Sequence, residues 1–135
     1  MSKRTAHLIS HTHWDREWYL PYEKHHVRLV ELVDTLLDTL ENDPGYRSFF
    51  LDGQTIILED YLQVRPDNRE RLQALITAGR IGIGPWYILQ DAFLTSGEAI
   101  SATCRSAMRM PPAGVRYPRS AISPTRSALS ARRRS

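Results

Sequence analysis

The chain has 135 residues, 41% of them apolar, which is enough for one domain or for part of a larger one. It contains no apolar run of the about 18 residues that suggest a membrane span, and the run after its basic start is too short for a signal peptide. The single cysteine, Cys104, cannot form an internal disulfide and favours a reducing compartment. We therefore expect a cytoplasmic protein with no membrane partner.

The net charge of +3 averages two unlike parts of the chain. Residues 1–99 hold 10 lysines and arginines against 15 acidic residues, a net charge of −5, whereas residues 100–135 hold 8 arginines and no acid, a net charge of +8. A basic tail can indicate nucleic-acid binding, but here the body is acidic and Tyr117 is the tail's only aromatic residue. We expect no nucleic-acid partner.

The first part of the chain predicts a strand, a long helix and a second strand. Residues 5–11 predict a short buried strand that leads into a polar, aromatic-rich loop. Residues 21–41 predict an amphipathic helix, because Pro21 suits a first turn and the following apolar residues share one face. These residues are Leu29, Val30, Val33, Leu36, Leu37 and Leu40. The run N-D-P-G at 42–45 ends this helix, and residues 48–51 predict the second strand.

Two shorter helices and a third strand follow. Residues 55–63 predict a helix that is broken at Pro66, and Asp67 can cap another helix that ends at Gly79. Residues 80–84 predict the third strand. The order β-α-β-αα-β favours parallel strands with helical crossovers, in a barrel-type or open α/β sheet.

The character of the chain changes after Ala99. Residues 100–135 are rich in Ser, Ala, Arg and Pro, and they hold half of the chain's 8 prolines. A segment without helical or strand periodicity cannot bury enough apolar surface to offset the entropy of ordering it. We therefore expect a disordered Arg/Ser/Pro-rich tail at 100–135.

Residues 10–18, with the sequence S-H-T-H-W-D-R-E-W, carry the chemistry of the chain. Side chains at alternate positions of extended backbone point the same way, so His13 and Asp15 can face one point. Imidazole and carboxylate are a common ligand pair for zinc or a similar divalent ion. The loop follows a strand, where α/β folds place their ligands. H-x-H alone is also found in other metallohydrolases, and the same run is compatible with a solvated polar loop.

Trp14, Trp18 and Tyr19 crowd the same loop, where polar residues are the rule. An indole face can stack on the apolar face of a sugar ring. The alternative is that a tryptophan packs beneath the loop, which we expect of at least one of the two. We expect Trp18 to be the exposed one, because it follows the ligand pair by one short turn.

The run H-T-H-W-D-R-E-W resembles the opening motif H-x-H-x-D-x-x-W of the family 38 glycoside hydrolases, which are metal-dependent α-mannosidases. G-P-W-Y-I-L-Q-D at 84–91, with S-G-E at 96–98, is similar to the family's G-x-W…P-D…S-G-E segment. L-D-G-Q-T at 51–55 and L-E-D-Y-L at 58–62 resemble its bacterial branch.

The resemblance covers residues 6–99. It implies that residues 1–99 are the N-terminal part of the catalytic domain, a seven-stranded (β/α) barrel-like α/β fold.

The resemblance also implies roles for individual residues. His13 and Asp15 would bind the metal, expected to be Zn²⁺, and Trp18 would flank the mannose. Trp86 and Asp91 match positions beside the sugar, although Asp91 fits equally well as a cap of the turn before residue 96. The implied enzyme is a retaining glycosidase of α-mannoside carbohydrates, in which one carboxylate attacks the anomeric carbon and a second acts as acid and then base. The metal would hold sugar hydroxyls and distort the ring.

The family's nucleophile lies in a G-Y-F-P-D-T-F-G motif beyond the S-G-E segment, and neither that motif nor the last metal-binding histidine occurs here. We therefore expect no catalytic residue in this chain and no activity. Residues 118–132, back-translated with chosen synonymous codons and read in a shifted frame, can encode K-I-G-Y-F-P-D-T-F-G. The simplest interpretation is that a nucleotide was lost just after the codon of Ala99.

Two alternatives remain open. The first is a mannosylglycerate hydrolase of the same family, since the loops that determine specificity are not in the chain. The second is a small H-x-H-x-D metal-dependent hydrolase, which would need further ligands, and His25 and His26 fall on a helix distant in sequence from the loop. The linkage cleaved, the exact metal and a homo-oligomeric parent enzyme also stay open.

Overall fold

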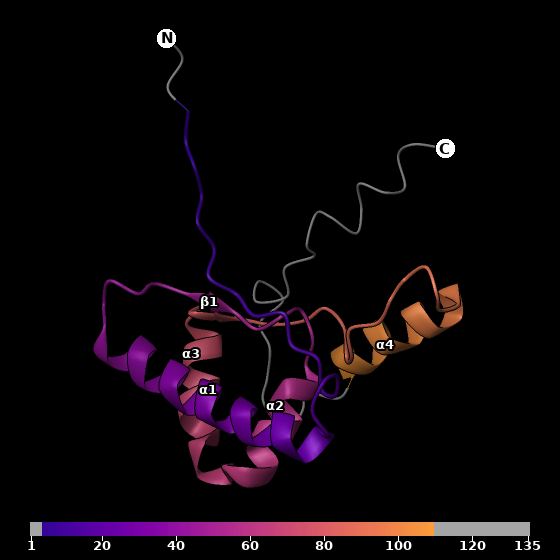
Figure 1. Ribbon diagram of the computed structural model, residues 1–135. Helices are drawn as coiled ribbons and strands as arrows, with labels where there is room; N and C mark the ends of the chain where they lie inside the picture. Colours follow the sequence, from indigo (N-terminus) through magenta and orange to yellow (C-terminus); the bar gives the residue numbers. More distant parts are fainter. Residues whose placement is uncertain (1–3, 110–135) are drawn as a thin grey trace.

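The computed structural model describes residues 4–109. The elements follow in the order α1 (Tyr22–Asn42), β1 (Phe49–Phe50), α2 (Ile56–Val64), the 3-10 helix η1 (Pro66–Asn68), α3 (Arg69–Thr77), β2 (Ile81–Gly82) and α4 (Gly97–Arg109). Figure 1 shows α1, α2 and α3 together on one side of the two strands, with α4 lying off to the side of this group. The fold is therefore a small α/β arrangement with its helices on one face of the sheet.

The strands are parallel, as the alternation of elements predicted. In β1 and β2, Phe49 lies opposite Ile81 and Phe50 opposite Gly82. An isolated parallel bridge between His11 and Phe50 adds the start of the chain to the other edge of β1. The two edges differ because the N–H of Phe50 donates to Ser10 O at 2.9 Å, whereas the N–H groups of Phe49 and Leu51 on either side of it donate to carbonyls of the β2 segment. Three stretches of chain thus run side by side.

The predicted buried strand at residues 5–11 is wrong in length and in burial. Only its last residues pair with β1, and the preceding ones are extended and exposed: Leu8 is 99% exposed and Ile9 73%. Figure 1 shows this segment leaving the body as an extended trace. The apolar composition of this segment is typical of a strand covered on both faces. It is exposed because no element within residues 4–109 covers it.

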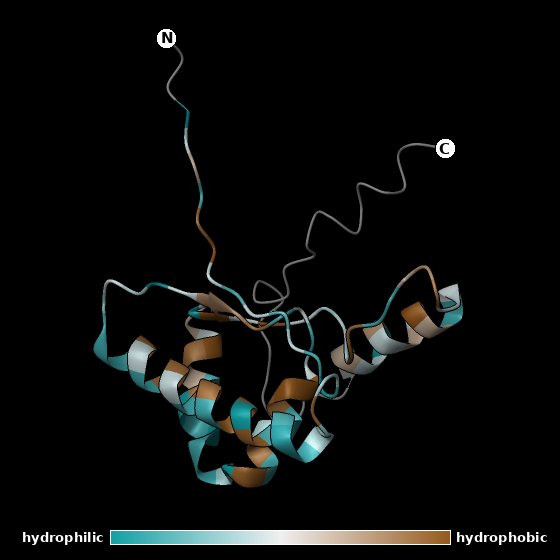
Figure 2. Cartoon of the chain, in the orientation of Figure 1, coloured by the Kyte–Doolittle hydropathy of each residue, from teal (hydrophilic) through white to brown (hydrophobic). Residues whose placement is uncertain are grey.

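Helix α1 forms where the apolar periodicity placed it, beginning after Pro21. Its buried face consists of His25, Leu29, Val33, Leu36, Leu37 and Leu40, while Val30 is only half-buried. Figure 2 shows the apolar side of α1 turned toward the other helices and its hydrophilic side outward. No helix among the described residues is both long enough and apolar enough to cross a bilayer.

The core lies between α1, α2, α3 and the two strands. It joins the α1 face to buried side chains of α2, α3 and β2 and of the residues that directly follow the strands, namely Leu51, Ile57, Leu58, Tyr61, Leu62, Leu72, Leu75, Ile76, Ile81 and Ile83. Complete burial of one such side chain stabilises the folded state by about 1.5–3 kcal/mol. This core supports the strand ends from which the site is built.

Helix α3 differs from its prediction at one end and confirms it at the other. Asp67 lies inside η1, so it does not cap the helix; Asn68 precedes it, without a side-chain capping bond. The reason is that Pro66 starts a 3-10 turn that takes up Asp67. At the far end Gly79 has φ of 70°, and it and Arg80 donate N–H groups to carbonyls of the last turn, as a glycine stop requires.

Helix α4 overturns part of the predicted disordered tail. The helix runs to Arg109, so the prediction of disorder from residue 100 is wrong for 100–109. Ser96 Oγ accepts the N–H of Ala99 at 3.1 Å and so caps the first turn. Ala107 is buried, and Thr103 O accepts the N–H of Tyr87 at 3.1 Å, which ties the helix to the body. The rest of the predicted tail lies outside the described residues.

Candidate functional site

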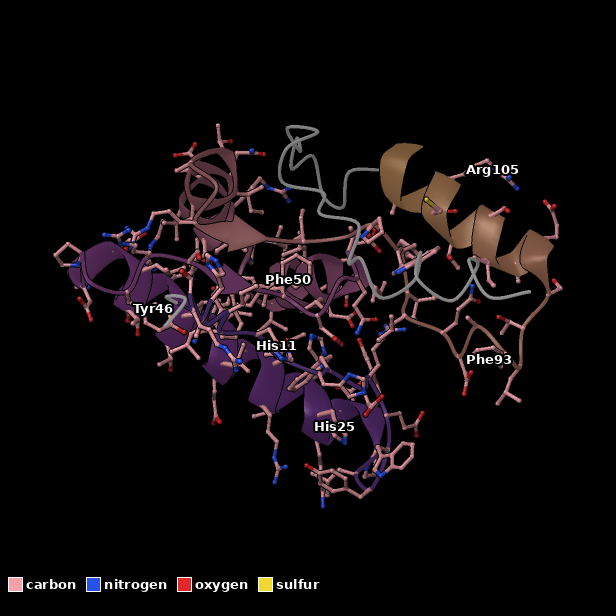
Figure 3. The ribbon with its side chains drawn as sticks, turned by 90° about the horizontal axis from the view of Figure 1, so that it is seen from above. His11, His25, Tyr46, Phe50, Phe93 and Arg105 are labelled. Carbon is pink, nitrogen blue, oxygen red and sulfur yellow. The ribbon has the colours of Figure 1, made fainter. Side chains whose placement is uncertain are left out.

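A cavity of about 580 Å³ lies where the loops leave the strands. Residues 13–18, which follow the bridge at His11, form one wall, and residues 88–91 form the other, with Gln54 between them. In Figure 3, a view from above, His11 lies close to Phe50, which shows where the first of these segments crosses β1. Parallel strands end at the same edge of their sheet, so their following loops meet there.

The structure brings four of the five predicted site residues to this cavity: His13, Asp15, Trp18 and Asp91. Trp86 lines a separate cavity of about 110 Å³, together with Gln90, Ala92 and Ile100. Its backbone explains the difference, because Trp86 donates its N–H to Gly53 O at 3.1 Å and continues the line of β2. Gln90 lines both cavities, so the two lie next to each other.

His13 and Asp15 offer the donor chemistry of a divalent metal site. The His13 side chain is 73% exposed, and its Nδ1 lies 3.6 Å from Oδ1 of Asp52, a carboxylate that is almost fully buried. Burial raises the pKa of Asp52 above its ordinary value, while the N–H of Trp14 and the nearby His13 act in the opposite direction. His13 and Asp15 both line the cavity, and an imidazole nitrogen together with a carboxylate suits a divalent cation.

In number, the donors fit only part of a coordination sphere. Zinc sites use three or four protein ligands. Among residues 4–109, no group of three or more His, Cys, Asp or Glu side chains could hold a metal ion. His13 and Asp15 can therefore supply two ligands, and the others would have to come from elsewhere.

The two tryptophans of the loop divide as predicted. Trp18 lines the cavity and is 76% exposed, so its ring is free to stack on a ligand. Trp14 packs against the core and meets the ring of His25 edge-on, with centroids 5.9 Å apart. Trp14 therefore anchors the loop, and Trp18 remains the candidate sugar platform.

Asp91 caps a turn, which was one of the two roles that its sequence context left open, and it also lies at the cavity. Its Oδ1 accepts the N–H of Phe93 at 3.1 Å, and its carbonyl accepts the N–H of Leu94 at 3.1 Å, so it caps a turn. The same residue lines the cavity. Figure 3 shows Phe93 at the outer end of this loop, and it is 94% exposed.

The two helical histidines do not complete the metal site. His25 is buried beneath Trp14 and Tyr19, and its ring lies 5.1 Å from that of Tyr19. His26 Nε2 lies 2.6 Å from the carbonyl oxygen of Asp60 on α2. Neither residue lines the cavity, so the small-hydrolase alternative does not gain its missing ligands from this helix.

Sequence reasoning missed the ion pair that fastens the loop to α2. Arg16 donates from Nε and Nη2 to the two oxygens of Asp60, at 2.7 and 2.9 Å. Asp60 is buried, and its hydrogen bond to Arg16 raises the pKa of the guanidinium, against the opposing effect of burial. The only signal was that the two motif stretches carry opposite charges at these positions.

Comparison with known proteins gives a family match over most of the chain. Residues 3–104 match the model of the glycosyl hydrolases family 38 N-terminal domain. A relative from Halalkalibacterium halodurans, provisionally named a mannosylglycerate hydrolase, is 60% identical over 97 residues, which are 72% of this chain and 11% of the relative.

Two solved structures from Enterococcus faecalis are similar to the chain. One, from strain V583, is described as an α-mannosidase and is 60% identical, with a TM-score of 0.71. The other is described as a protein of glycosyl hydrolase family 38 and is 55% identical, with a TM-score of 0.66. Each match covers 73% of this chain but 11% of the solved one. The chain thus spans about a ninth of the length of these relatives.

Proposed function

Because the chain belongs to glycosyl hydrolase family 38, we propose that it is the N-terminal part of the catalytic domain of a metal-dependent, retaining α-mannosidase. The observation that carries the proposal is the cavity that gathers His13, Asp15, Trp18 and Asp91 from two separate loops. A cation site, an exposed indole and a carboxylate around one hollow suit a sugar, which presents hydroxyls on its edge and an apolar face.

The proposed roles follow from the chemistry of each side chain. His13 and Asp15 would hold the metal, which when bound would supply positive charge toward the sugar hydroxyls. Trp18 stacks on the ring face, because it is exposed beside the ligand pair. One oxygen of Asp91 is used by the turn, and the other can accept a hydroxyl proton of the sugar.

A retaining glycosidase also needs two carboxylates about 5–5.5 Å apart on either side of the scissile bond. The chain lacks the G-Y-F-P-D-T-F-G motif that supplies the nucleophile in the resembling family. We therefore propose that the 135-residue chain is inactive by itself. The three parallel stretches at residues 10–12, β1 and β2 would be the first part of a larger barrel-like sheet.

Two substrates are favoured by different relatives. The name of the Halalkalibacterium relative favours mannosylglycerate, and the α-mannosidase from Enterococcus favours an α-mannoside more generally. Both contain an α-linked mannose, and Trp18 and the ligand pair would serve either. Assays of the same enzyme with mannosylglycerate and with an aryl α-mannoside distinguish them.

The test uses the gene with its frame restored after the codon of Ala99. We expect hydrolysis of an α-mannoside that is lost on chelation and falls by at least about 100-fold in His13→Ala, since outer partners alone cost 10–100-fold. His7→Ala removes a histidine outside the cavity and should change nothing. Full activity in His13→Ala would refute the metal role, and hydrolysis by the 135-residue chain that Asp15→Ala removes would show that the catalytic set lies within it.

A further inference from the structure

The turn after β1 has a backbone that few residues adopt. Asp52 has φ of 34° and Gly53 φ of 66°, so two successive residues lie in the left-handed region. A residue with a Cβ is strained there by about 1–2 kcal/mol, and such strain persists only where the surroundings impose it. A Cβ on Gly53 would lie 3.3 Å from Gly84 O, so the turn is also pressed against the segment that leads to the second wall of the cavity.

Asp52 directs its carboxylate at the back of the ligand loop. Oδ2 accepts the N–H of Trp14 at 2.6 Å and an N–H of Gln54 at 2.9 Å. Oδ1 lies 3.6 Å from Nδ1 of His13, and the carboxylate side chain is 7% exposed. At this distance the pair is an electrostatic contact rather than a hydrogen bond, and it favours the ring orientation that turns Nδ1 toward the carboxylate and leaves the other nitrogen free for the metal.

Gln54 joins the two walls of the cavity through one buried amide. The residue is 2% exposed. Besides its bond to Asp52, Nε2 donates to Trp14 O at 2.6 Å, and Oε1 accepts the N–H of Leu89 at 3.1 Å. Both amide protons and the amide oxygen are therefore used, which only this orientation of the side chain allows. The wall at Trp14 is thus held at a fixed spacing from the wall at Leu89.

We propose that the Asp52–Gln54 turn is the positioning element of the site: Asp52 orients His13, and Gln54 sets the distance between the two walls. The inference rests on the proposed function for the meaning of the ligand pair, and it deepens that function. The ligand loop is held by the chain's own hydrogen bonds, so His13 and Asp15 are presented to a metal before one binds.

If the turn were purely structural, substitutions in it would lower stability without changing the tautomer of the His13 ring. The test therefore needs a control variant that lowers stability at a distance from the site. Tyr61→Phe provides it. Tyr61 is fully buried, and its hydroxyl donates to Asp34 Oδ1 at 2.6 Å and accepts from Asn68 Nδ2 at 2.6 Å. The variant therefore loses buried hydrogen bonds away from the cavity.

The first arm measures amide hydrogen exchange by NMR in the 135-residue chain with Gln54→Met, which keeps the length of the side chain. The Leu89 amide should exchange about tenfold faster, as expected for the loss of one hydrogen bond. The exchange rate of the Leu51 amide, which donates to Gly82 O at 2.8 Å within the sheet, should stay unchanged and serves as the reference. In Tyr61→Phe the exchange rate of the Leu89 amide should not rise relative to that of the Leu51 amide. Unchanged exchange at Leu89 in Gln54→Met would overturn the role of Gln54.

The second arm uses Asp52→Asn and the nitrogen resonances of the His13 ring, with the exposed His7 as an internal reference. In the parent chain, His13 should favour the tautomer with its proton on Nδ1. In Asp52→Asn, the ratio of the two His13 tautomers should shift toward the ratio found for His7. In a Zn²⁺ titration, the Kd should rise by about 10–100-fold in Asp52→Asn, as is typical when a residue that supports a metal ligand is lost. The Kd should not change in Tyr61→Phe. An unchanged His13 spectrum in Asp52→Asn would overturn the proposal.

The two proposals fail in different ways. If the parent chain binds no Zn²⁺ at His13, its two ligands are too few to hold the ion and the frame-restored enzyme decides the metal role, while the exchange and tautomer measurements still decide whether the turn positions the loop. If Zn²⁺ binds with equal affinity to the parent chain and to both turn variants, the metal role stands and the positioning role is refuted.

Discussion

At the scale of single residues, Asp60 illustrates how the ligand loop is fastened to the core. Its carboxylate is 2% exposed, whereas its partner Arg16 is 34% exposed. Tyr22 adds a third contact, with its hydroxyl donating to Asp60 Oδ1 at 3.2 Å. A buried carboxylate is tolerated when it is paired and hydrogen-bonded, and it becomes costly when one partner is removed.

We expect Arg16→Met to destabilise the chain by about 3 kcal/mol, because it leaves the Asp60 charge buried without its cation. Urea denaturation measures the change. The double variant Arg16→Met with Asp60→Leu removes the stranded charge and should recover a large part of the loss. A single variant within about 0.5 kcal/mol of the parent would contradict this account, since that is the range of ordinary surface changes.

Arg71 provides a pH-dependent contact between α3 and α1. Its Nη2 donates to Glu41 Oε2 at 2.6 Å and to Asp38 Oδ1 at 2.7 Å. The hydrogen bond from Arg71 lowers the pKa of Glu41 below its usual range, against the smaller effect of burial. A carboxyl with a lowered pKa in the folded state contributes stability above its unfolded pKa, about 4.3 for Glu, and loses it as pH falls through the folded value.

The pair lies at the surface, so its contribution is modest. We expect Arg71→Met to lower the free energy of unfolding by about 0.5 kcal/mol at pH 7. The difference from the parent should shrink as the solution is acidified from pH about 4 down through the lowered pKa of Glu41, below which Glu41 is protonated in both chains. Denaturation curves at several pH values measure this. A difference that grows on acidification would show the sign to be wrong.

At the scale of elements, the local sequence pattern correctly predicted helix α1 and the end of α3. The spacing of Leu29, Val33 and Leu37 identified α1, because a helix buries the same side at every turn. Gly79 identified the end of α3, because its backbone conformation favours glycine. Residues 5–11 and α4 were mispredicted because burial of the first and ordering of the second depend on partners distant in sequence.

The core face of α1 gives a matched pair of leucines. Leu37 is fully buried and Leu8 is 99% exposed. We expect Leu37→Ala to lower the free energy of unfolding by about 2–5 kcal/mol, and Leu8→Ala to change it by less than about 0.5 kcal/mol. Thermal or urea unfolding of both variants measures the contrast. Equal effects would mean that this core does not form in solution as described.

At the scale of the whole molecule, the site could be predicted in part. The motif at residues 10–18 predicted a ligand pair and an exposed Trp18, and the structure places both at one cavity. Asp52 and Gln54 were not predicted as site residues, because their contacts arise only when the loops after three parallel stretches meet. Trp86 lines the neighbouring cavity, since its backbone belongs to the line of β2, and its role beside a sugar stays a prediction.

The match to relatives leads to a prediction about the gene. The family match ends at residue 104, within α4, and the matched 97 residues of the Halalkalibacterium relative are 11% of its length. We propose that the reading frame changes near the codon of Ala99. The DNA, read in the shifted frame from there, should encode P-D-T-F-G and then several hundred further residues. Resequencing the locus tests this, and a stop codon soon after that point in the shifted frame would refute it.

The exposed segment before the first bridge has a consequence for handling the purified chain. Leu8 and Ile9 stand in extended backbone just before the stretch that pairs with the edge of β1, and they are 99% and 73% exposed. Extended apolar edges are where separate molecules join strand to strand, the step from which aggregates grow. We therefore expect that one lysine in place of Leu8 would raise the concentration at which the chain begins to aggregate.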